Sequence, residues 1–161
     1  MSKSKLFYEE VNIGDEIPNL GPLTWNTTDI VRFSSAVENY EPLHQARDWA
    51  RSKGYKDTLI NGPIRTSMLH NMLINWIGDD GFLKKLSCQQ RAVDHPGHTL
   101  VAKGSVVNRY IGEDGLGYIE CDVYIENQEG VITAPGKATV VLPTNENPNV
   151  PESFELPKSL N

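Results

Sequence analysis

Hydrophobic and polar residues follow a helical period in the first half of the chain and a strand period in the second half. In residues 28–37, apolar side chains recur at the three- and four-residue steps of one helix face, and Thr27 or Thr28 can cap the first turn. A shorter helix is predicted for residues 46–53, because Gly54 ends the pattern there. The segment "ENYEPLHQA" separates these two helices, since its proline lacks an amide donor.

The longest helical pattern covers residues 63–77 and follows the joint "NGP", whose proline suits the first turn of a helix. Most positions in this pattern are apolar, and three polar residues fall on a narrow stripe at four-residue steps: Ser67, Asn71 and Asn75. A helix with so narrow a polar stripe must be covered over most of its circumference. We therefore predict a central helix that ends at Gly78.

Beyond this helix the period drops to two residues. The segment "YIECDVYIE" places Ile119, Cys121, Val123 and Ile125 on one face and polar or tyrosine side chains on the other, which is typical of a half-buried antiparallel strand. Further strands are predicted at about residues 86–93, 100–111 and 131–142. Their connections, "DHPGH", "GEDGLG" and "NQEG", are short and rich in turn residues, which predicts a meander.

The two ends of the chain lack a long periodic pattern. Residues 6–25 are broken by "GDEIPNLGP", so we expect one or two short extended pieces between turns. Residues 143–161 carry four prolines among polar residues and are predicted to form an extended surface segment, docked by Phe154 and Leu156. The remaining residues, 1–142, are expected to form one domain.

An antiparallel sheet with one apolar face and one mostly apolar helix predicts an α+β fold in which the sheet wraps around the helix. A sheet of this kind leaves a free edge, and pairing with a second copy would remove it. We therefore expect a homodimer.

Composition and charge exclude several classes of function. The 161 residues carry a formal net charge of −6 with scattered acidic residues, which gives a nucleic-acid backbone nothing to bind. The start "MSKSKLFYEE" and the absence of a stretch of about 20 apolar residues predict a cytoplasmic protein without a membrane partner. Cys88 and Cys121 are predicted to be reduced, buried thiols, because two isolated cysteines form no disulfide framework.

His44, in the irregular segment "ENYEPLH" between two helices, is the main candidate for proton transfer. The amides at the start of the central helix, around Gly62, suit a carbonyl oxygen that gains negative charge. An ordinary loop and an ordinary helix entry remain open alternatives. His70 is expected to be a helix residue without a function, and His95 and His98 lack a third ligand for a metal.

The order of helix, "P-x-H" loop, short helix, "NGP" joint, apolar helix and antiparallel strands resembles the MaoC-like hydratase/dehydratase family of hotdog-fold proteins. The resemblance covers about residues 20–142 and is strongest in "RFSSAVENYEPLH", "LINGPIRTSMLHNMLINWIGDDGFLKKLS" and "HPGHTLVAKGSV". In that family the loop reads aspartate, any residue, asparagine, proline, any residue, histidine. Pro42 and His44 match this pattern, whereas Asn39 stands in place of the aspartate and Glu41 in place of the asparagine.

The resemblance implies that His44 is the acid/base and that the amide of Gly62, or its neighbour, polarises a thioester carbonyl. Asn39 cannot take a proton, but its amide can position water. The resemblance further implies a substrate site lined by Glu41, Asn61, Pro63, Ser67 and Met68, with an acyl chain against apolar residues such as Met72 and Trp76. Lys53 and Arg65 can meet the phosphates of coenzyme A, although solvated surface charges are the ordinary interpretation.

The function implied by the resemblance is an (R)-specific enoyl-CoA hydratase or 3-hydroxyacyl-thioester dehydratase of fatty-acid metabolism. Its substrate is an acyl-CoA or acyl-carrier thioester, and it needs no metal or cofactor beyond the coenzyme A of the substrate. Asn39 supports an alternative, a non-catalytic acyl-thioester-binding subunit of a heteromeric MaoC-like dehydratase. A third possibility is a hotdog thioesterase in which Glu38 or Glu41 is the catalytic carboxylate.

Overall fold

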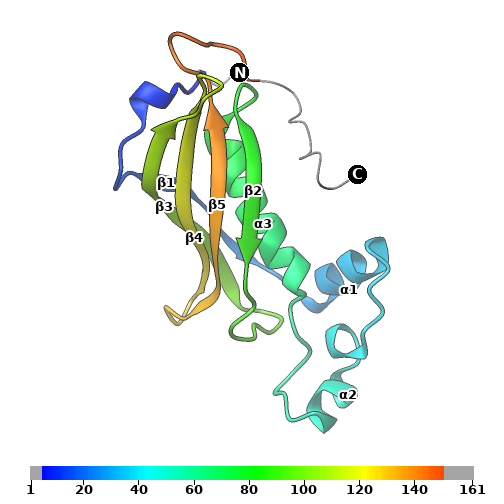
Figure 1. Cartoon of the computed structure of the whole chain (residues 1–161). Coiled ribbons are helices and arrows are strands. Elements are labelled where there is room, and N and C mark those ends of the chain that lie inside the picture. The colour runs from blue at the N-terminus through cyan, green and yellow to red at the C-terminus, as the bar shows by residue number, and fades with distance from the viewer. Residues whose placement is uncertain (1–4, 151–161) are drawn as a thin grey trace.

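A computed structural model describes residues 5–150 of the chain as one antiparallel sheet packed on a long helix (Figure 1). The helices are α1 (Thr27–Ala36), α2 (Arg47–Ser52) and α3 (Gly62–Ile77), and two short 3-10 turns are η1 (Tyr8–Glu10) and η2 (Pro42–His44). The strands are β1 (Glu16–Thr24), β2 (Phe82–Cys88), β3 (Thr99–Ile111), β4 (Gly117–Asn127) and β5 (Ile132–Leu142). The strand order is β1-β3-β4-β5-β2. This is the hotdog arrangement, and it confirms the expected α+β fold.

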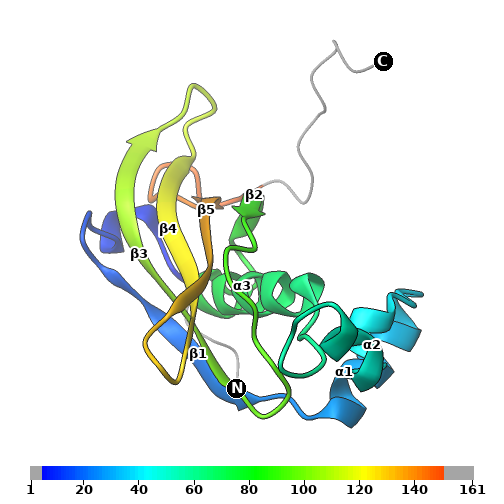
Figure 2. The same cartoon turned by 90° about the horizontal axis from the view of Figure 1, so that it is seen from below.

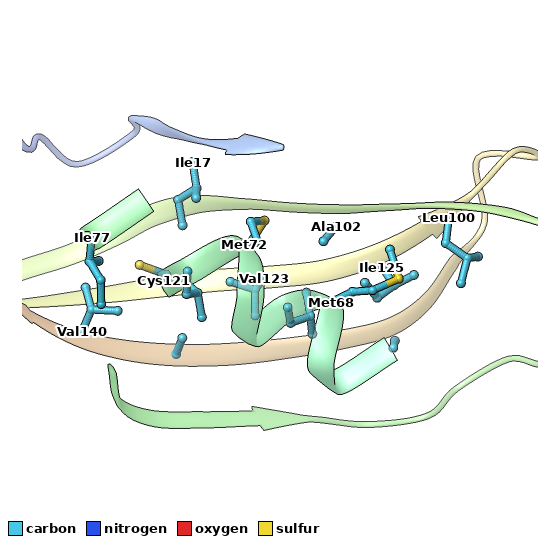
Figure 3. Packing of buried hydrophobic residues seen from close by; sticks show 14 of the residues in the cluster. Ile17, Met68, Met72, Ile77, Leu100, Ala102, Cys121, Val123, Ile125 and Val140 are labelled. Atoms are coloured by element: carbon cyan, nitrogen blue, oxygen red, sulfur yellow. The ribbon is translucent and has the colours of Figure 1, made fainter. Parts of the chain in front are cut away.

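The core lies between α3 and the inner face of the sheet. Met68 and Met72 of α3 meet Val123 and Ile125 of β4 there, with Leu100 at one end of the cluster (Figure 3). The alternation predicted for β4 is confirmed, since its four inner residues are almost completely buried. Seen from below, α1 and α2 lie beyond the N-terminal end of α3 (Figure 2). Burial of α3 therefore fixes the position of its first turn next to both small helices.

The pairing of β2 differs from the predicted meander. The strand was expected at residues 86–93 and next to β3, but β2 (Phe82–Cys88) pairs antiparallel with β5 and forms the sheet edge opposite β1. Only β3, β4 and β5 form a meander. The connection "DHPGH" therefore belongs to a crossover from the edge strand β2 to the interior strand β3, which local turn signals do not reveal.

The segment "GDEIPNLGP" was predicted to break residues 6–25 into short extended pieces. Instead, most of it belongs to the single nine-residue strand β1. This strand pairs only with β3, and its register shifts twice, between Ile17 and Leu20 and between Leu20 and Leu23. A proline removes one ladder hydrogen bond, and an edge strand tolerates that loss when the missing amide faces away from its neighbour. Pro18 and Pro22 are therefore compatible with a strand at this place.

One face of α3 is less covered than its narrow polar stripe predicts. Ile74 is 38% exposed, and its neighbours on this face, Ser67, His70, Asn71 and Asn75, are exposed as well. Cys121 is buried as expected, and burial, followed by the Asp122 and Glu120 carboxylates, raises the pKa of its thiol to about 12. Cys88 is only half-buried, which corrects the prediction for this thiol.

The chain after β5 forms no helix or strand as far as residue 150. It returns along η1, where the amide of Tyr8 donates to the carbonyl of Pro143 at 2.9 Å. The predicted docking residues Phe154 and Leu156 lie outside the described residues. Within residues 5–150, no helix combines the length and apolar character needed to span a bilayer.

Two neighbouring residues of α3 test the core. Leu73 is fully buried, whereas Ile74 is partly exposed. We expect Leu73→Ala to lower the free energy of unfolding by about 2–5 kcal/mol, because it leaves a cavity, and Ile74→Ala to lower it by less than about 1 kcal/mol. Urea denaturation of both variants measures the difference. Equal losses would contradict the packing described for α3.

Candidate functional site

The loop that carries His44 begins at the end of α1 with a tightly bonded turn. The amide of Asn39 donates to the carbonyl of Ser34 at 2.8 Å, and the amide of Glu38 donates to the carbonyl of Ser35 at 3.3 Å. This pair of bonds is a Schellman motif, in which the first residue beyond the helix end adopts a left-handed conformation. That residue is Glu38, with φ of 53°, the only non-glycine residue with positive φ in residues 5–150.

The opposite end of α1 corrects the expected cap. The side chain of Asn26 accepts from the amide of Asp29 at 3.1 Å, and the amide of Asn26 donates to the Asp29 carboxylate at 3.2 Å. This reciprocal pair is a capping box, so Asn26 caps the helix instead of Thr27 or Thr28.

Asn39 has a structural partner within the same loop. Its side-chain oxygen accepts from the amide of Glu41 at 3.3 Å, which is an Asx-turn. The amide of His44 then donates to the carbonyl of Glu41 at 3.0 Å and closes η2. The loop is thus built from consecutive local hydrogen bonds, although Glu41 itself is exposed.

His44 is half-buried and its ring is anchored at one nitrogen. Nδ1 lies 2.9 Å from the carbonyl oxygen of Leu59, and the amide of Leu59 donates to the carbonyl of Leu43 at 2.9 Å. A carbonyl only accepts, so Nδ1 carries the ring proton and Nε2 of the neutral ring is the acceptor. Nε2 has no hydrogen-bond partner within the described part of the chain. The ring is therefore held in one orientation with a free basic nitrogen.

Gly62 begins α3 only three residues after Leu59. Its amide has no acceptor among residues 5–150, and it stands at the positive end of a 16-residue helix. A side chain at this position would meet Gln90, whose Cγ lies 3.2 Å from the position of an added Cβ. Three residues span at most about 10 Å, which brings the imidazole of His44 within roughly 13 Å of this amide.

The other residues expected to line the site lie in different surroundings. Asn61 is fully buried, and its side-chain amide donates to the hydroxyl of Ser34 at 3.2 Å, which ties α1 to the start of α3. Pro63 and Ser67 are exposed on α3, and Met68 is buried in the core. The structure therefore brings His44, Asn39 and Gly62 to one end of α3, whereas Asn61 and Met68 have internal partners.

A hollow of about 340 Å³ opens between β1 and α3. It is lined by Pro18, Asn19, Leu20, Met72, Asn75 and Trp76, and thus includes two of the apolar residues expected against an acyl chain. Met72 lies ten residues beyond Gly62, which corresponds to about 15 Å along the helix axis. His44 does not line this hollow.

Arg65 was expected to be either a solvated surface charge or a ligand for a phosphate of coenzyme A. The structure contradicts both expectations, because its side chain is buried. Its side chain is 5% exposed, and Nη1 lies 3.2 Å from a carboxylate oxygen of the fully buried Asp94. Burial lowers the pKa of the Arg65 guanidinium, and the carboxylate of Asp94 counters that effect. Arg65 precedes the buried residues Leu69 and Met72 by four and seven positions, a spacing that places it on the buried side of α3. Lys53, by contrast, is exposed over the ring of Trp49.

His95 and His98 belong to the same polar cluster. Nδ1 of His95 lies 2.9 Å from the carbonyl oxygen of Thr58, and Nδ1 of His98 lies 3.3 Å from the other carboxylate oxygen of Asp94. The two rings meet edge to face with centroids 5.6 Å apart. Within residues 5–150, no group of three or more metal-binding side chains is present.

Comparison with known proteins supports the fold. No family model matches the chain. No curated protein sequence matches it either. Solved structures do match. An (R)-hydratase from A. caviae involved in PHA biosynthesis has a TM-score of 0.74 at 19% identity, over 84% of this chain and 99% of that chain.

A MaoC-like dehydratase from Rhodospirillum rubrum has a TM-score of 0.74 at 17% identity, over 85% of this chain and 96% of that chain. The ChsH1-ChsH2 complex from Mycobacterium tuberculosis matches with a TM-score of 0.71 at 21% identity, over 81% of this chain and 98% of that chain. This chain therefore shares the hotdog fold of MaoC-like dehydratases and R-hydratases.

The left-handed conformation of Glu38 gives a prediction for the loop. A left-handed conformation costs an ordinary residue about 1–2 kcal/mol, whereas glycine adopts it freely. We expect Glu38→Gly to raise the free energy of unfolding by about 1 kcal/mol, as measured by urea denaturation. Glu41→Gly is the matched control, because φ of Glu41 is −59° and glycine relieves nothing there. A stabilisation of equal size in both variants would refute this assignment of strain.

Proposed function

We propose that the chain is a MaoC-like hydratase/dehydratase that adds water reversibly to the double bond of an enoyl thioester, with (R) stereochemistry. The proposal rests on one observation. The imidazole of His44 is anchored through Nδ1 to Leu59, three residues before the unpaired amide of Gly62, and its Nε2 is left free. A free base and an unpaired helix N-terminus are the two groups that this reaction requires.

In the direction of hydration, Nε2 of His44 removes a proton from water as the water oxygen bonds to the β-carbon. The electron pair of the double bond moves towards the thioester, and its carbonyl oxygen gains negative charge. The amide of Gly62 donates to that oxygen, aided by the dipole of α3. The imidazolium then returns the proton to the α-carbon, so that one water has been added and the ring is neutral again.

The proposed substrate is an acyl-CoA or an acyl-carrier thioester. The reaction transfers no electrons to or from a cofactor, and coenzyme A enters as part of the substrate. An acyl chain that runs from the start of α3 along the helix would reach the hollow beside Met72 and Trp76, about 15 Å away.

We further propose a cytoplasmic oligomer whose domain is formed by residues 1–142, with residues 143–161 as its extension. The outer edge of β2 and the exposed face of α3 around Ile74 support an oligomer, because both leave groups for a second chain to cover. The partner is a second copy under this proposal, or a related chain under the alternative below.

The alternative is a non-catalytic thioester-binding subunit of a heteromeric dehydratase. One observation favours it. Asn39 cannot transfer a proton, and its side-chain oxygen already accepts from the amide of Glu41. The matched ChsH1-ChsH2 structure is a complex of two named components.

Activity of the purified chain towards enoyl-CoA thioesters tests the leading proposal. Loss of the conjugated double bond is followed by its ultraviolet absorbance. We expect measurable hydration, lowered by about a hundredfold to ten-thousandfold in His44→Ala, because the general base is removed. His70→Ala is the matched control, since His70 is exposed on α3. Equal activity of wild type and His44→Ala would refute the role of His44.

Asn39→Asp separates the catalytic and non-catalytic proposals. If the chain is an enzyme by itself, we expect this variant to hydrate enoyl-CoA at least as fast as wild type, because a carboxylate joins His44. Binding of thioester by wild type without turnover, with activity gained by Asn39→Asp or by adding a related chain, supports the subunit. Release of free thiol without hydration selects the thioesterase and overturns both.

A further inference from the structure

A buried carboxylate lies on the far side of the segment that anchors His44. Asp94 is fully buried and accepts from three side chains: Nη1 of Arg65 at 3.2 Å, Nδ1 of His98 at 3.3 Å and the amide of Asn127 at 3.3 Å. These partners come from α3, from the crossover after β2 and from the end of β4. The position of Asp94 is therefore fixed by three separate parts of the fold.

The bridging segment, residues 58–60, is hydrogen-bonded on both of its edges. On one edge, the amide of Ile60 donates to the backbone carbonyl of Asp94 at 2.8 Å, and the ring of His95 bonds the carbonyl of Thr58 at 2.9 Å. On the other edge, the carbonyl of Leu59 accepts from Nδ1 of His44, and the amide of Leu59 donates to the carbonyl of Leu43 in the loop. The polar cluster and the loop thus hold one three-residue segment from opposite sides.

We propose that Asp94 is a positioning residue for His44 and acts through the bridging segment. The Asp94 side chain is held by Arg65, His98 and Asn127, which fixes its backbone carbonyl and hence the amide of Ile60. The carbonyl of Leu59, one residue earlier, then stands at a defined place for Nδ1 of His44. The direction of the catalytic nitrogen Nε2 is therefore set by a carboxylate that does not contact the ring.

A contribution to stability alone does not explain this cluster. A buried ion pair is often no more stabilising than apolar side chains of the same volume, because both charges lose their hydration. Nε of Arg65 is buried without a hydrogen-bond partner among residues 5–150, which adds a further penalty. The ion pair holds Asp94 in one position. Through the hydrogen bond from the amide of Ile60 to Asp94, it also fixes the segment that bonds His44.

The catalytic part of this inference rests on the proposed function, whereas the structural part does not. A displacement of about 1 Å of a catalytic group can lower a rate by about a hundredfold. We therefore expect Asp94→Asn to lower kcat by about a hundredfold and to leave KM unchanged, because the variant keeps the substrate-binding residues. The ring proton on Nδ1 of His44 reports the same displacement without any substrate.

The experiment measures this ring proton by nitrogen-15 NMR, assigned by comparison with His44→Gln. In wild type we expect a proton on Nδ1 that is protected from exchange with water. In Asp94→Asn we expect faster exchange and a shifted resonance. An unchanged resonance together with an unchanged kcat in folded Asp94→Asn would overturn the proposal. A wild type without hydratase activity would refute the proposed function, and the resonance would still decide the positioning role.

Two further variants separate positioning from loss of stability. The double variant Arg65→Met/Asp94→Leu removes both charges and leaves no unpaired ion, and His95→Ala keeps the ion pair but removes the bond to Thr58. We expect both to perturb the His44 resonance. A double variant as stable as wild type, with a wild-type His44 resonance, would show that the cluster is only structural and overturn the proposal.

Asp114→Asn is the distant control. The Asp114 carboxylate accepts from the hydroxyl of Tyr118 at 2.7 Å, in the turn between β3 and β4 and at the opposite end of these strands from Asn127. Burial, followed by this carboxylate, raises the pKa of Tyr118 to about 12. We expect the His44 resonance and kcat to be unchanged in Asp114→Asn. An equal perturbation by this control would assign the effect to general destabilisation and overturn the proposal.

Discussion

Burial of α3 against the sheet is the constraint on which the candidate site depends. The helix contributes fully buried residues such as Leu69 and Leu73 to the core, so its first turn cannot move independently of the sheet. The bridging segment, residues 58–60, leads directly into this turn and is hydrogen-bonded on both edges. The imidazole of His44 is bonded to that segment, and its orientation is therefore a consequence of core packing several residues away.

The sequence predicted the features whose cause is local. The apolar pattern identified α3 to within one residue, and the alternation around Cys121 identified β4 and its buried face. The pairing of β2 with β5 depends on contacts between distant parts of the chain, and no turn signal carries that information. For the site, sequence reasoning named His44 and Gly62 but missed Asp94, because a single aspartate in a turn has no pattern. Arg65 carried a usable signal, since a charge on the buried side of a helix requires a buried partner.

The loop around Asn39 has a defined shape that does not depend on a carboxylate. The Schellman motif at the end of α1, the Asx-turn of Asn39 and the 3-10 turn of η2 follow one another without a break and lead the chain to His44. An asparagine accepts the same backbone hydrogen bond as an aspartate, so the turn does not require a carboxylate. A carboxylate at this position is required only for proton transfer. Under the proposed function, asparagine at this position keeps the geometric role but cannot perform the acid/base role.

Under the proposed function, symmetry limits how the carboxylate that the resembled family has in place of Asn39 can be replaced. Every subunit of a homo-oligomer presents the same loop, so a second copy brings Asn39 again and cannot supply the lost group. Exposed carboxylates in the same loop, Glu38 and Glu41, are available within one chain, but Glu38 is committed to the turn through its backbone. Under the proposed function, a homo-oligomer therefore relies on His44 and, within this loop, on the exposed carboxylate of Glu41. A heteromer escapes this restriction, because a related chain with a different loop can provide a complete pair in its own site. Fold similarity alone does not choose between these cases, since one fold accommodates both active and inactive sites.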